Sequence, residues 1–334
     1  MPLDTLGEFI AAIEQSGELV RVREPVRTRL EIAEIADRCM KSRDGGPALL
    51  FERPVMEDGS TSPMPVAINL FGSTRRICLA LGAEKLDDIG CRISELLEMK
   101  VPKGFLEKLA LLPRLAELAK FPPKTRGGRP PCQEIVLEGG DVDLGRIPFL
   151  VTWPGDGGRY ITLPLVITED PARGIRNVGM YRIQVLRRNE LAMNWQRHKV
   201  GAAHWREMAE RGERMPVVIA IGGDPASIYT GSAPLPPTID EFLFAGFLRK
   251  SPVELAKAVT CDLAVPAEAE IVIEGYVDPG EPLVLEGPFG DHTGFYSLAD
   301  YYPKVHVTAA TMRKDPVYPA TLVGRPPMED YYLG

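Results

Sequence analysis

The sequence predicts a mixed α/β fold, with an α/β domain over residues 1–122 followed by a β-rich domain, a barrel or a sandwich, over residues 123–334. Three observations lead to this prediction. Helical and strand patterns alternate in the first third, a basic segment rich in proline and glycine follows within residues 101–131, and short strand patterns separated by turn residues occupy the rest. A chain of 334 residues is long enough for two domains. We place the boundary near residue 123.

The N-terminal domain begins with a helix that the sequence marks clearly. Thr5 and Glu8 form a capping-box pattern, apolar residues then recur at helical spacing, and Gly17 is a typical helix stop. Ser73 is placed to cap a second, short helix that ends near Leu81. The remaining patterns predict strands at 19–22, 48–51 and 65–71 and helices at about 30–41 and 86–99.

The β-rich domain is predicted from its apolar and β-branched runs. These runs predict strands at 134–137, 162–168, 177–186, 217–221, 269–277 and 305–312, and helical patterns lie at 202–211, 239–249 and 252–257. The last residues, 318–334, read as a strand that leads into the start of a helix.

Composition narrows the class of protein. The formal net charge is −7 and no stripe of lysine or arginine is present, so we expect neither a nucleic-acid surface nor an anionic-membrane surface. No apolar run is long enough to cross a bilayer, and the first residues form an amphipathic helix rather than a signal peptide. The five cysteines are scattered without metal-site spacing, which predicts buried, inert thiols in a reducing cytoplasm.

The most informative segment is 285–295 (LEGPFGDHTGF). It places Glu286 and Asp291 five residues apart, with two glycines and a proline between them. Glycine permits positive φ and proline fixes its own φ, so we expect a tight loop rather than a helix or strand. Two acids on such a loop can act as a proton donor and its electrostatic partner. The alternative is a glycine-rich hairpin whose acids are simply solvated.

Four segments in one order resemble a known family. They are 173–182 (RGIRNVGMYR), 194–199 (NWQRHK), 229–241 (YTGSAPLPPTIDE) and 285–294 (LEGPFGDHTG), with GRPP at 324–327. Together they resemble the UbiD-like decarboxylases, which use prenylated FMN to remove or add a carboxylate on aromatic or α,β-unsaturated acids. The resemblance is greatest to the branch that acts on 4-hydroxy-3-polyprenylbenzoate in ubiquinone biosynthesis. It implies that the β-rich domain is a split β-barrel that binds the flavin.

The resemblance also implies a metal and cofactor site. Asn177, His198 and Glu241 match the positions where the family holds a divalent metal, usually manganese, against the cofactor phosphate, with potassium nearby. An amide oxygen, an imidazole and a carboxylate suit such a cation. Taken alone, these side chains are typical of a turn asparagine, a core or interface histidine and an acid at a helix N-terminus. The implied cofactor-binding residues are Asn177, Val178, Gly179, Met180, Tyr181, Arg182, His198 and Glu241.

Arg182 matches the active-site arginine of the family, and with Glu286 and Asp291 it completes the implied catalytic set. An arginine can bind a substrate carboxylate through two parallel hydrogen bonds. Glu286 can then deliver a proton to the carbon that loses its carboxylate. At Asp291 the family uses Asp or Glu. The alternative for Arg182 alone is an exposed strand arginine.

The resemblance sets further expectations. A flavin prenyltransferase would supply the cofactor, the substrate would be a small aromatic acid with peripheral contact to membrane lipid, and the full-length family would form homo-oligomers. Family chains run past residue 334, so we expect a C-terminal domain to be absent here and activity to be weak. A split-barrel FMN oxidoreductase and a catalytically silent fragment remain alternatives. The segment 222–225 follows a strand but lacks the GxGxxG pattern, which argues against a dinucleotide enzyme.

Overall fold

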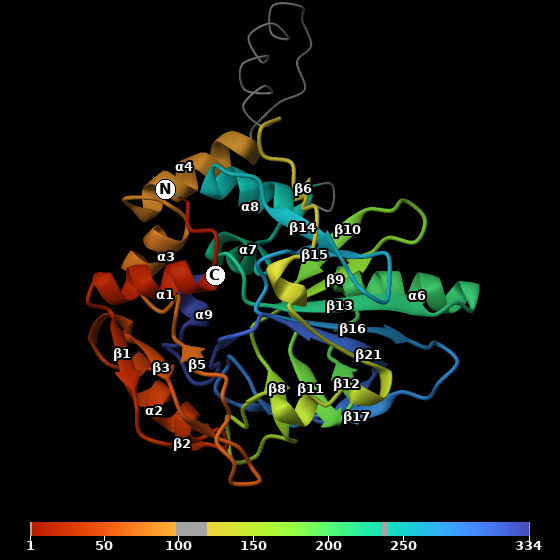
Figure 1. Cartoon of the computed structure of the whole chain (residues 1–334), viewed down its shortest axis with the longest axis horizontal. Coiled ribbons are helices and arrows are strands. Elements are labelled where there is room, and N and C mark those ends of the chain that lie inside the picture. Colours follow the sequence, from red (N-terminus) through yellow and green to blue (C-terminus); the bar gives the residue numbers. More distant parts are fainter. Residues whose placement is uncertain (1, 98–118, 236–238, 334) are drawn as a thin grey trace, which may run out of the picture.

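The structure is a computed structural model that describes residues 2–97, 119–235 and 239–333. The end of the helix predicted at 86–99 and the first part of the segment 101–131, up to residue 118, lie outside the described residues. In Figure 1 the N-terminal elements gather on one side and the strand-rich part lies on the other, with helix α6 (Val200–Arg211) at its far edge. The expected boundary between residues 122 and 123 stays a prediction.

The first helix forms where the capping box predicts it. Helix α1 spans Leu6–Gln15, and the Thr5 hydroxyl accepts a hydrogen bond from the Glu8 backbone N–H at 3.1 Å. Its apolar face is buried, and the chain turns at Gly17, whose φ is +77°. The other helices of this part are α2 (Glu31–Met40), α3 (Thr74–Ala80), which Ser73 caps as predicted, and α4 (Leu86–Leu97).

The N-terminal part contains a four-stranded sheet. Its order is β1-β3-β5-β22, with β1 at Leu19–Val22, β3 at Ala48–Phe51, β5 at Val66–Ile68 and β22 at Tyr318–Ala320. Strand β22 lies parallel to β5, although some 250 residues separate them in sequence. The end of the chain therefore returns to the N-terminal sheet, and the short helix α9 (Asp330–Leu333) follows it.

The second part is built on one nine-stranded sheet. The order is β10-β9-β13-β16-β21-β12-β11-β8, and β7 pairs with β21 beside this path. The mixed, strand-rich fold class is thus confirmed, and the sheet runs from edge strand β10 to edge strand β8. The strands are β7 (Ile135–Glu138), β8 (Arg159–Ile161), β9 (Pro164–Glu169), β10 (Arg176–Gly179), β11 (Ile183–Arg187), β12 (Glu190–Met193), β13 (Met215–Ile221), β16 (Ile271–Val277) and β21 (Lys304–Met312).

Two sequence-based predictions were wrong in this part. Residues 252–257, expected as a helix, contain strand β14 (Glu254–Lys257), which pairs with β15 (Ala264–Pro266) and β6 (Lys124–Thr125). The strand expected over 177–186 is broken into β10 and β11, which lie toward opposite ends of the sheet. Pairing with distant strands overrides local propensity in the first case. In the second, residues 180–182 leave the sheet altogether.

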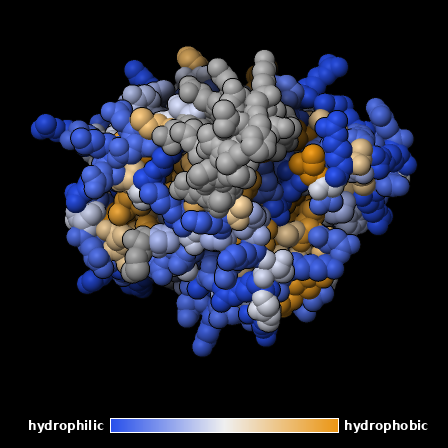
Figure 2. Space-filling view, turned by 90° about the horizontal axis from the view of Figure 1, so that it is seen from above, coloured by the Kyte–Doolittle hydropathy of each residue, from blue (hydrophilic) through white to orange (hydrophobic). Residues whose placement is uncertain are grey.

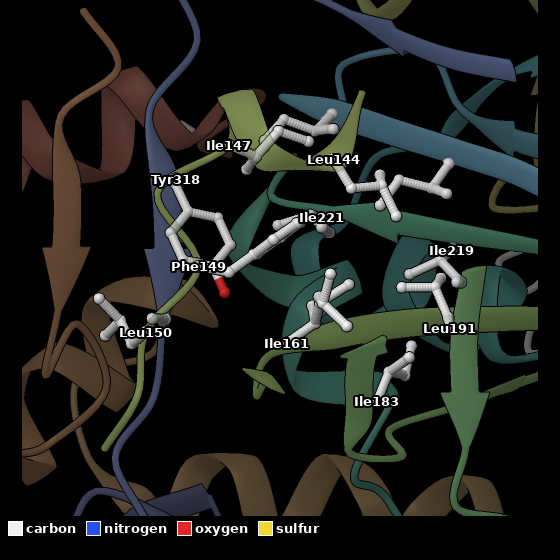
Figure 3. Packing of buried hydrophobic residues seen from close by; sticks show 14 of the residues in the cluster. Leu144, Ile147, Phe149, Leu150, Ile161, Ile183, Leu191, Ile219, Ile221 and Tyr318 are labelled. Carbon is white, nitrogen blue, oxygen red and sulfur yellow. The ribbon is translucent and has the colours of Figure 1, made fainter. Parts of the chain in front are cut away.

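The core is continuous between the two parts. Phe149 and Tyr318 meet edge to face with ring centroids 5.3 Å apart, and Figure 3 shows them beside Ile161 and Ile221 of the large sheet. Tyr318 belongs to β22, so the returning strand carries one of the largest buried side chains to this junction.

The surface is predominantly polar where Figure 2 shows it in colour, with apolar residues in separate patches. Among the described residues, no helix is both long and apolar enough to cross a membrane. All five cysteines are free. The expectation that they are buried holds for Cys78 and Cys132, holds in part for the half-buried Cys39 and Cys261, and fails at Cys91, which is exposed. Burial raises the pKa of Cys132 to about 12, which keeps that thiol protonated.

Candidate active site

The structure brings Arg182, Glu286 and Asp291 together. Arg182 Nε and Nη2 lie 2.9 and 3.0 Å from the two carboxylate oxygens of Glu286, and Nη1 lies 2.7 Å from Asp291 Oδ2. Glu286 ends strand β17 (Val284–Glu286), and Asp291 follows strand β18 (Phe289–Gly290). The guanidinium therefore joins both ends of the predicted loop at residues 286–291, which we call the acid loop. The pairing with Glu286 is the parallel two-bond geometry that makes arginine–carboxylate pairs strong.

Burial makes this network sensitive to charge. The Glu286 side chain is 0% exposed, whereas Asp291 is 26% exposed. Burial lowers the pKa of Arg182, but its hydrogen bonds and attraction to the two carboxylates more than offset this, so that its pKa is raised overall. Arg182 is therefore a fixed positive charge between two acids. Its guanidinium also lies over the Phe289 ring, 5.0 Å from the centroid.

Asn194 is a member of the site that sequence reasoning missed. Its Nδ2 donates to Glu286 Oε2 at 2.9 Å, and Asn194 itself is buried. The residue directly follows strand β12, which places it next to Arg182 in the fold. The available signal was its position at the start of the second family segment, NWQRHK. Glu286 is thus held by three N–H donors.

The acid loop is clamped along its length. The Gly287 N–H donates to Gln184 Oε1 at 2.9 Å, and the Pro288 carbonyl accepts from both the Gly157 N–H and the Tyr160 hydroxyl. Gly287 has φ +98°, a conformation that disfavours any side chain. The loop is therefore a rigid support for the two acids. The prediction that no strand forms in this segment was wrong, because Glu286 ends β17 and Phe289–Gly290 form β18, both paired with strands that follow in the chain.

A cavity of about 380 Å³ opens beside the network. Arg182, Asn194, Phe289 and Asp291 form one wall. The full lining is Thr162, Met180, Tyr181, Arg182, Asn194, Gln196, Lys199, Ser232, Phe289, Asp291, His292, Thr321, Val323, Asp330 and Leu333. Residues 180–182, which interrupt the expected strand, all line it. The break in the sheet is what presents Arg182 to the cavity.

Asn177 and Glu241 form a second group beside the cavity-lining Tyr181. Asn177 lies in β10, and Glu241 is the first residue of helix α8 (Glu241–Arg249). Burial raises the pKa of Glu241 to about 7, although the N–H groups of Val178 and of Glu241 itself point at its carboxylate. Glu241 Oε2 and Asn177 Nδ2 are buried without a hydrogen-bond partner. A buried carboxylate in this state needs a proton or a cation, so Glu241 fits the implied metal site, where Asn177 would bind through its amide oxygen.

The other predicted cofactor residues lie at different depths. Val178 and Gly179 are buried in β10, and the Met180 N–H donates to the Gly231 carbonyl at 2.8 Å. His198 is exposed in the turn before α6. The structure thus places Asn177 and Glu241 near Tyr181, and the ligand roles of Asn177, His198 and Glu241 all stay predictions. Among the described residues, no cluster of three His, Cys, Asp or Glu side chains is placed to hold a metal ion.

Comparison with known families shows to which family the chain belongs. Residues 124–326 match the 3-octaprenyl-4-hydroxybenzoate carboxy-lyase Rift-related domain (UbiD), and residues 10–93 match the N-terminal domain of the same carboxy-lyase. The chain belongs to the UbiD family. The UbiD match at residues 124–326 includes Arg182, Glu286 and Asp291.

Relatives and solved structures extend the match over nearly the whole chain. An uncharacterized protein of Aquifex aeolicus is 53% identical over 329 residues, covering 98% of this chain and 66% of the relative. A vanillic acid decarboxylase of Sedimentibacter hydroxybenzoicus, in its closed form, is 28% identical with a TM-score of 0.85, covering 100% of this chain and 67% of that one. An evolved dimeric form of the UbiD-class enzyme HmfF from Pelotomaculum thermopropionicum, in complex with prFMN, is 30% identical with a TM-score of 0.83, covering 99% and 69%. The chain spans about two thirds of the length of the relatives it matches.

Proposed function

We propose that this chain carries the flavin site and the proton donor of a non-oxidative decarboxylase that uses prenylated FMN. The observation that carries the proposal is Arg182 held between buried Glu286 and Asp291 on the wall of a cavity. Family membership supports it, as does the prFMN complex of the HmfF neighbour. An ordinary FMN oxidoreductase, the main alternative, offers no role for two acids clamped on one arginine.

We assign the residues of the site the following roles. Arg182 binds the carboxylate of the acid substrate, because its guanidinium lies at the cavity wall with a fixed positive charge. When the carbon–carbon bond breaks, carbon dioxide leaves and the carbon that held it takes up a proton. Glu286 delivers this proton in its protonated form, and it takes up a proton that originates from solvent before each turnover. Asn194 and Asp291 keep Glu286 and Arg182 in place. Prenylated FMN, when bound, would supply the electron sink for the carbanion-like carbon.

For the substrate, we propose a 4-hydroxybenzoate substituted at carbon 3. The vanillic acid that names one structural neighbour is such a compound, with a methoxy group at that position. The specific proposal is 4-hydroxy-3-polyprenylbenzoate, converted to 2-polyprenylphenol in ubiquinone biosynthesis. A para-hydroxyl can push electrons toward the ring carbon that holds the carboxylate, which favours protonation of that carbon by an acid such as Glu286 and then loss of carbon dioxide. A polyprenyl tail would bring the protein to a membrane surface, and a flavin prenyltransferase would supply the cofactor.

We further propose that Asn177, Glu241 and His198 hold a divalent metal, Mn²⁺, against the cofactor phosphate, with K⁺ nearby. The buried Glu241 Oε2, which has no hydrogen-bond partner, supports this proposal. Glu241→Ala should lower both the manganese and the flavin retained on purification to below about a tenth of wild type. Glu8→Ala, which alters an exposed acid of α1, is the control. Unchanged manganese and flavin in Glu241→Ala would exclude the ligand role.

The decisive test combines cofactor analysis with one substitution. The chain is produced with a flavin prenyltransferase and Mn²⁺, the released cofactor is weighed, and carbon dioxide release from 4-hydroxybenzoates is measured. Glu286→Gln should keep the prenylated flavin but lose activity by roughly 10²- to 10⁴-fold, because an amide cannot donate the proton. Glu281→Gln, whose carboxylate pairs with Lys304 and His306 outside the cavity, should stay near wild type. Unmodified FMN reduced by NADPH would instead favour the oxidoreductase.

A further inference from the structure

Only Gly157 of the segment that faces the acid loop, residues 152–157 (TWPGDG), has a role in the site described so far. The segment contacts the loop at two points between Glu286 and Asp291, and it contacts Tyr296 just after the loop. The Gly157 N–H donates to the Pro288 carbonyl at 2.7 Å, the Gly155 N–H donates to the Tyr296 hydroxyl at 2.9 Å, and the Gly290 N–H donates to Asp156 Oδ1 at 2.8 Å. The last of these contacts is made by a charged side chain to the residue next to Asp291.

Asp156 uses both of its oxygens in this arrangement. Its Oδ2 accepts three hydrogen bonds, from the Thr152 N–H at 3.1 Å, the Thr152 hydroxyl at 2.6 Å and the Trp153 N–H at 2.8 Å. Its Oδ1 accepts from Gly290. One oxygen thus fixes the carboxylate to its own turn, and the other holds the acid loop. Hydrogen bonds to a charged acceptor are among the stronger ones in proteins.

The same segment is anchored on two further sides. At Val151, the residue before the segment, the N–H donates to the Thr28 carbonyl and the carbonyl accepts from the Leu30 N–H. These bonds tie the start of the segment to the N-terminal part. The Trp153 indole N–H donates to the Val323 carbonyl at 2.8 Å, and Val323 lines the cavity. A Cβ added at Gly290 would lie 2.1 Å from the Trp153 ring, so the loop packs against this segment without spare room.

We propose that Asp156 is a positioning residue for the acid loop, and that it fixes Asp291 and, through Arg182, Glu286 relative to the substrate. Asp156 does not line the cavity and acts through the Gly290 backbone and the Asp291–Arg182 ion pair. The consequence for catalysis rests on the function proposed above. The anchoring of the loop does not, because it follows from the contacts alone.

The substitution Asp156→Asn separates the two oxygens. An asparagine has one acceptor oxygen and one NH₂ group, so one of the two sides must lose its acceptor. Turning the NH₂ toward Thr152 and Trp153 would oppose two backbone N–H groups, whereas turning it toward Gly290 opposes only one. The variant should therefore keep the turn at 152–153 and release the loop. Asp170→Asn is the matched control, because Asp170 Oδ1 accepts from the N–H groups of Ala172 and Arg173 in a turn outside the cavity.

The experiment measures amide hydrogen exchange in residues 286–296 and steady-state kinetics, both on the flavin-loaded protein. In Asp156→Asn, exchange at the Gly290 amide should accelerate at least tenfold and kcat should fall roughly ten- to a hundredfold, since small misplacements of reacting groups cost that much. KM and flavin content should stay within about twofold of wild type. Asp170→Asn should match wild type in all four quantities.

Two results would overturn the proposal. Unchanged exchange at Gly290 would show that Asp156 does not hold the loop. Faster exchange with an unchanged kcat would show that the loop needs no such anchor for catalysis. If the wild type releases no carbon dioxide from any aromatic acid, the proposed function fails instead, and the exchange measurement alone then supports or overturns the anchoring of the loop.

Discussion

Arg182 and Asn194 together determine the environment of Glu286. Three N–H donors converge on a carboxyl group that has no contact with solvent. Each donor satisfies an acceptor that burial would otherwise leave unpaired, which would cost on the order of 1–3 kcal/mol. Asn194 contributes its donor without adding a charge. Its neutrality therefore matters as much as its hydrogen bond, because the site already holds two acids against one guanidinium.

Asn194→Asp tests this point. A second carboxylate beside Glu286 would repel it in a buried site, so a proton must be shared and the pKa of the introduced acid rises. The native state then binds more protons than the unfolded state, and stability falls as pH rises. We expect a loss of about 1–3 kcal/mol at pH 8, a smaller loss at pH 5, and a fall in kcat of at least tenfold. Urea unfolding at both pH values measures the first two.

The control for this substitution is Asn189→Asp. Asn189 is exposed in the turn between β11 and β12, so the same charge is added in water and should change stability by less than about 0.5 kcal/mol. Equal losses at pH 5 and pH 8 in Asn194→Asp would mean that its effect is one of shape rather than of charge.

At the scale of elements, sequence reasoning worked where a local pattern decides the structure. The cap at Thr5, the strand at 19–22 and the positive φ at Gly287 each follow from residues within a few positions. Sequence reasoning failed where pairing between strands distant in sequence determines the local structure. Leu255 and Ala256 are buried by pairing with β15, which a local helical pattern cannot reveal, and the break at 180–182 is imposed by the path of the chain between distant strands of the sheet. For the same reason the contact from Asn194 to Glu286, across 92 residues, was missed.

The close approach of two loops gives a prediction at this scale. A Cβ added at Gly157 would lie 2.2 Å from the Gly287 carbonyl oxygen, and backbone atoms cannot move aside as a side chain can. Gly157→Ala should therefore cost about 1–3 kcal/mol of stability and lower kcat, because the acid loop must shift. Thermal unfolding and steady-state kinetics measure the two effects.

Gly140→Ala is the matched control for that prediction. Nothing lies within 4 Å of a Cβ built at Gly140, and its φ lies outside the positive region, so we expect a change of less than about 0.5 kcal/mol. A Gly157→Ala protein with wild-type stability and kcat would show that the loops can separate freely, contrary to the packing described here.

Over the whole molecule, the C-terminal segment joins the N-terminal sheet to the cavity. Glu329 is fully buried, and its two oxygens accept from the Phe71 N–H at 2.7 Å and from the Thr321 hydroxyl at 2.7 Å. Thr321 lines the cavity, and Phe71 follows strand β5 of the N-terminal sheet. One carboxyl group thus connects regions that lie some 250 residues apart in sequence. The cavity wall depends on the N-terminal part as well as on the large sheet.

Burial raises the pKa of Glu329 to about 7, although the Phe71 N–H, the Thr321 hydroxyl and nearby Arg76 each lower it. The native state therefore retains a proton that the unfolded state releases near pH 4.5, and this group makes the protein less stable as pH rises from about 4.5 to 7.

Glu329→Gln mimics the protonated form, since its amide can accept from Phe71 and donate to Thr321. At pH 8 the variant should be more stable than wild type by up to about 3 kcal/mol, and at pH 5 the two should be nearly equal. Urea unfolding at the two pH values measures this, with Glu138→Gln, an exposed acid at the end of β7, as the control that should show no pH-dependent difference. A Glu329→Gln protein less stable than wild type at pH 8 would show that the ionised carboxylate, paired with Arg76, is the form that holds the segment in place.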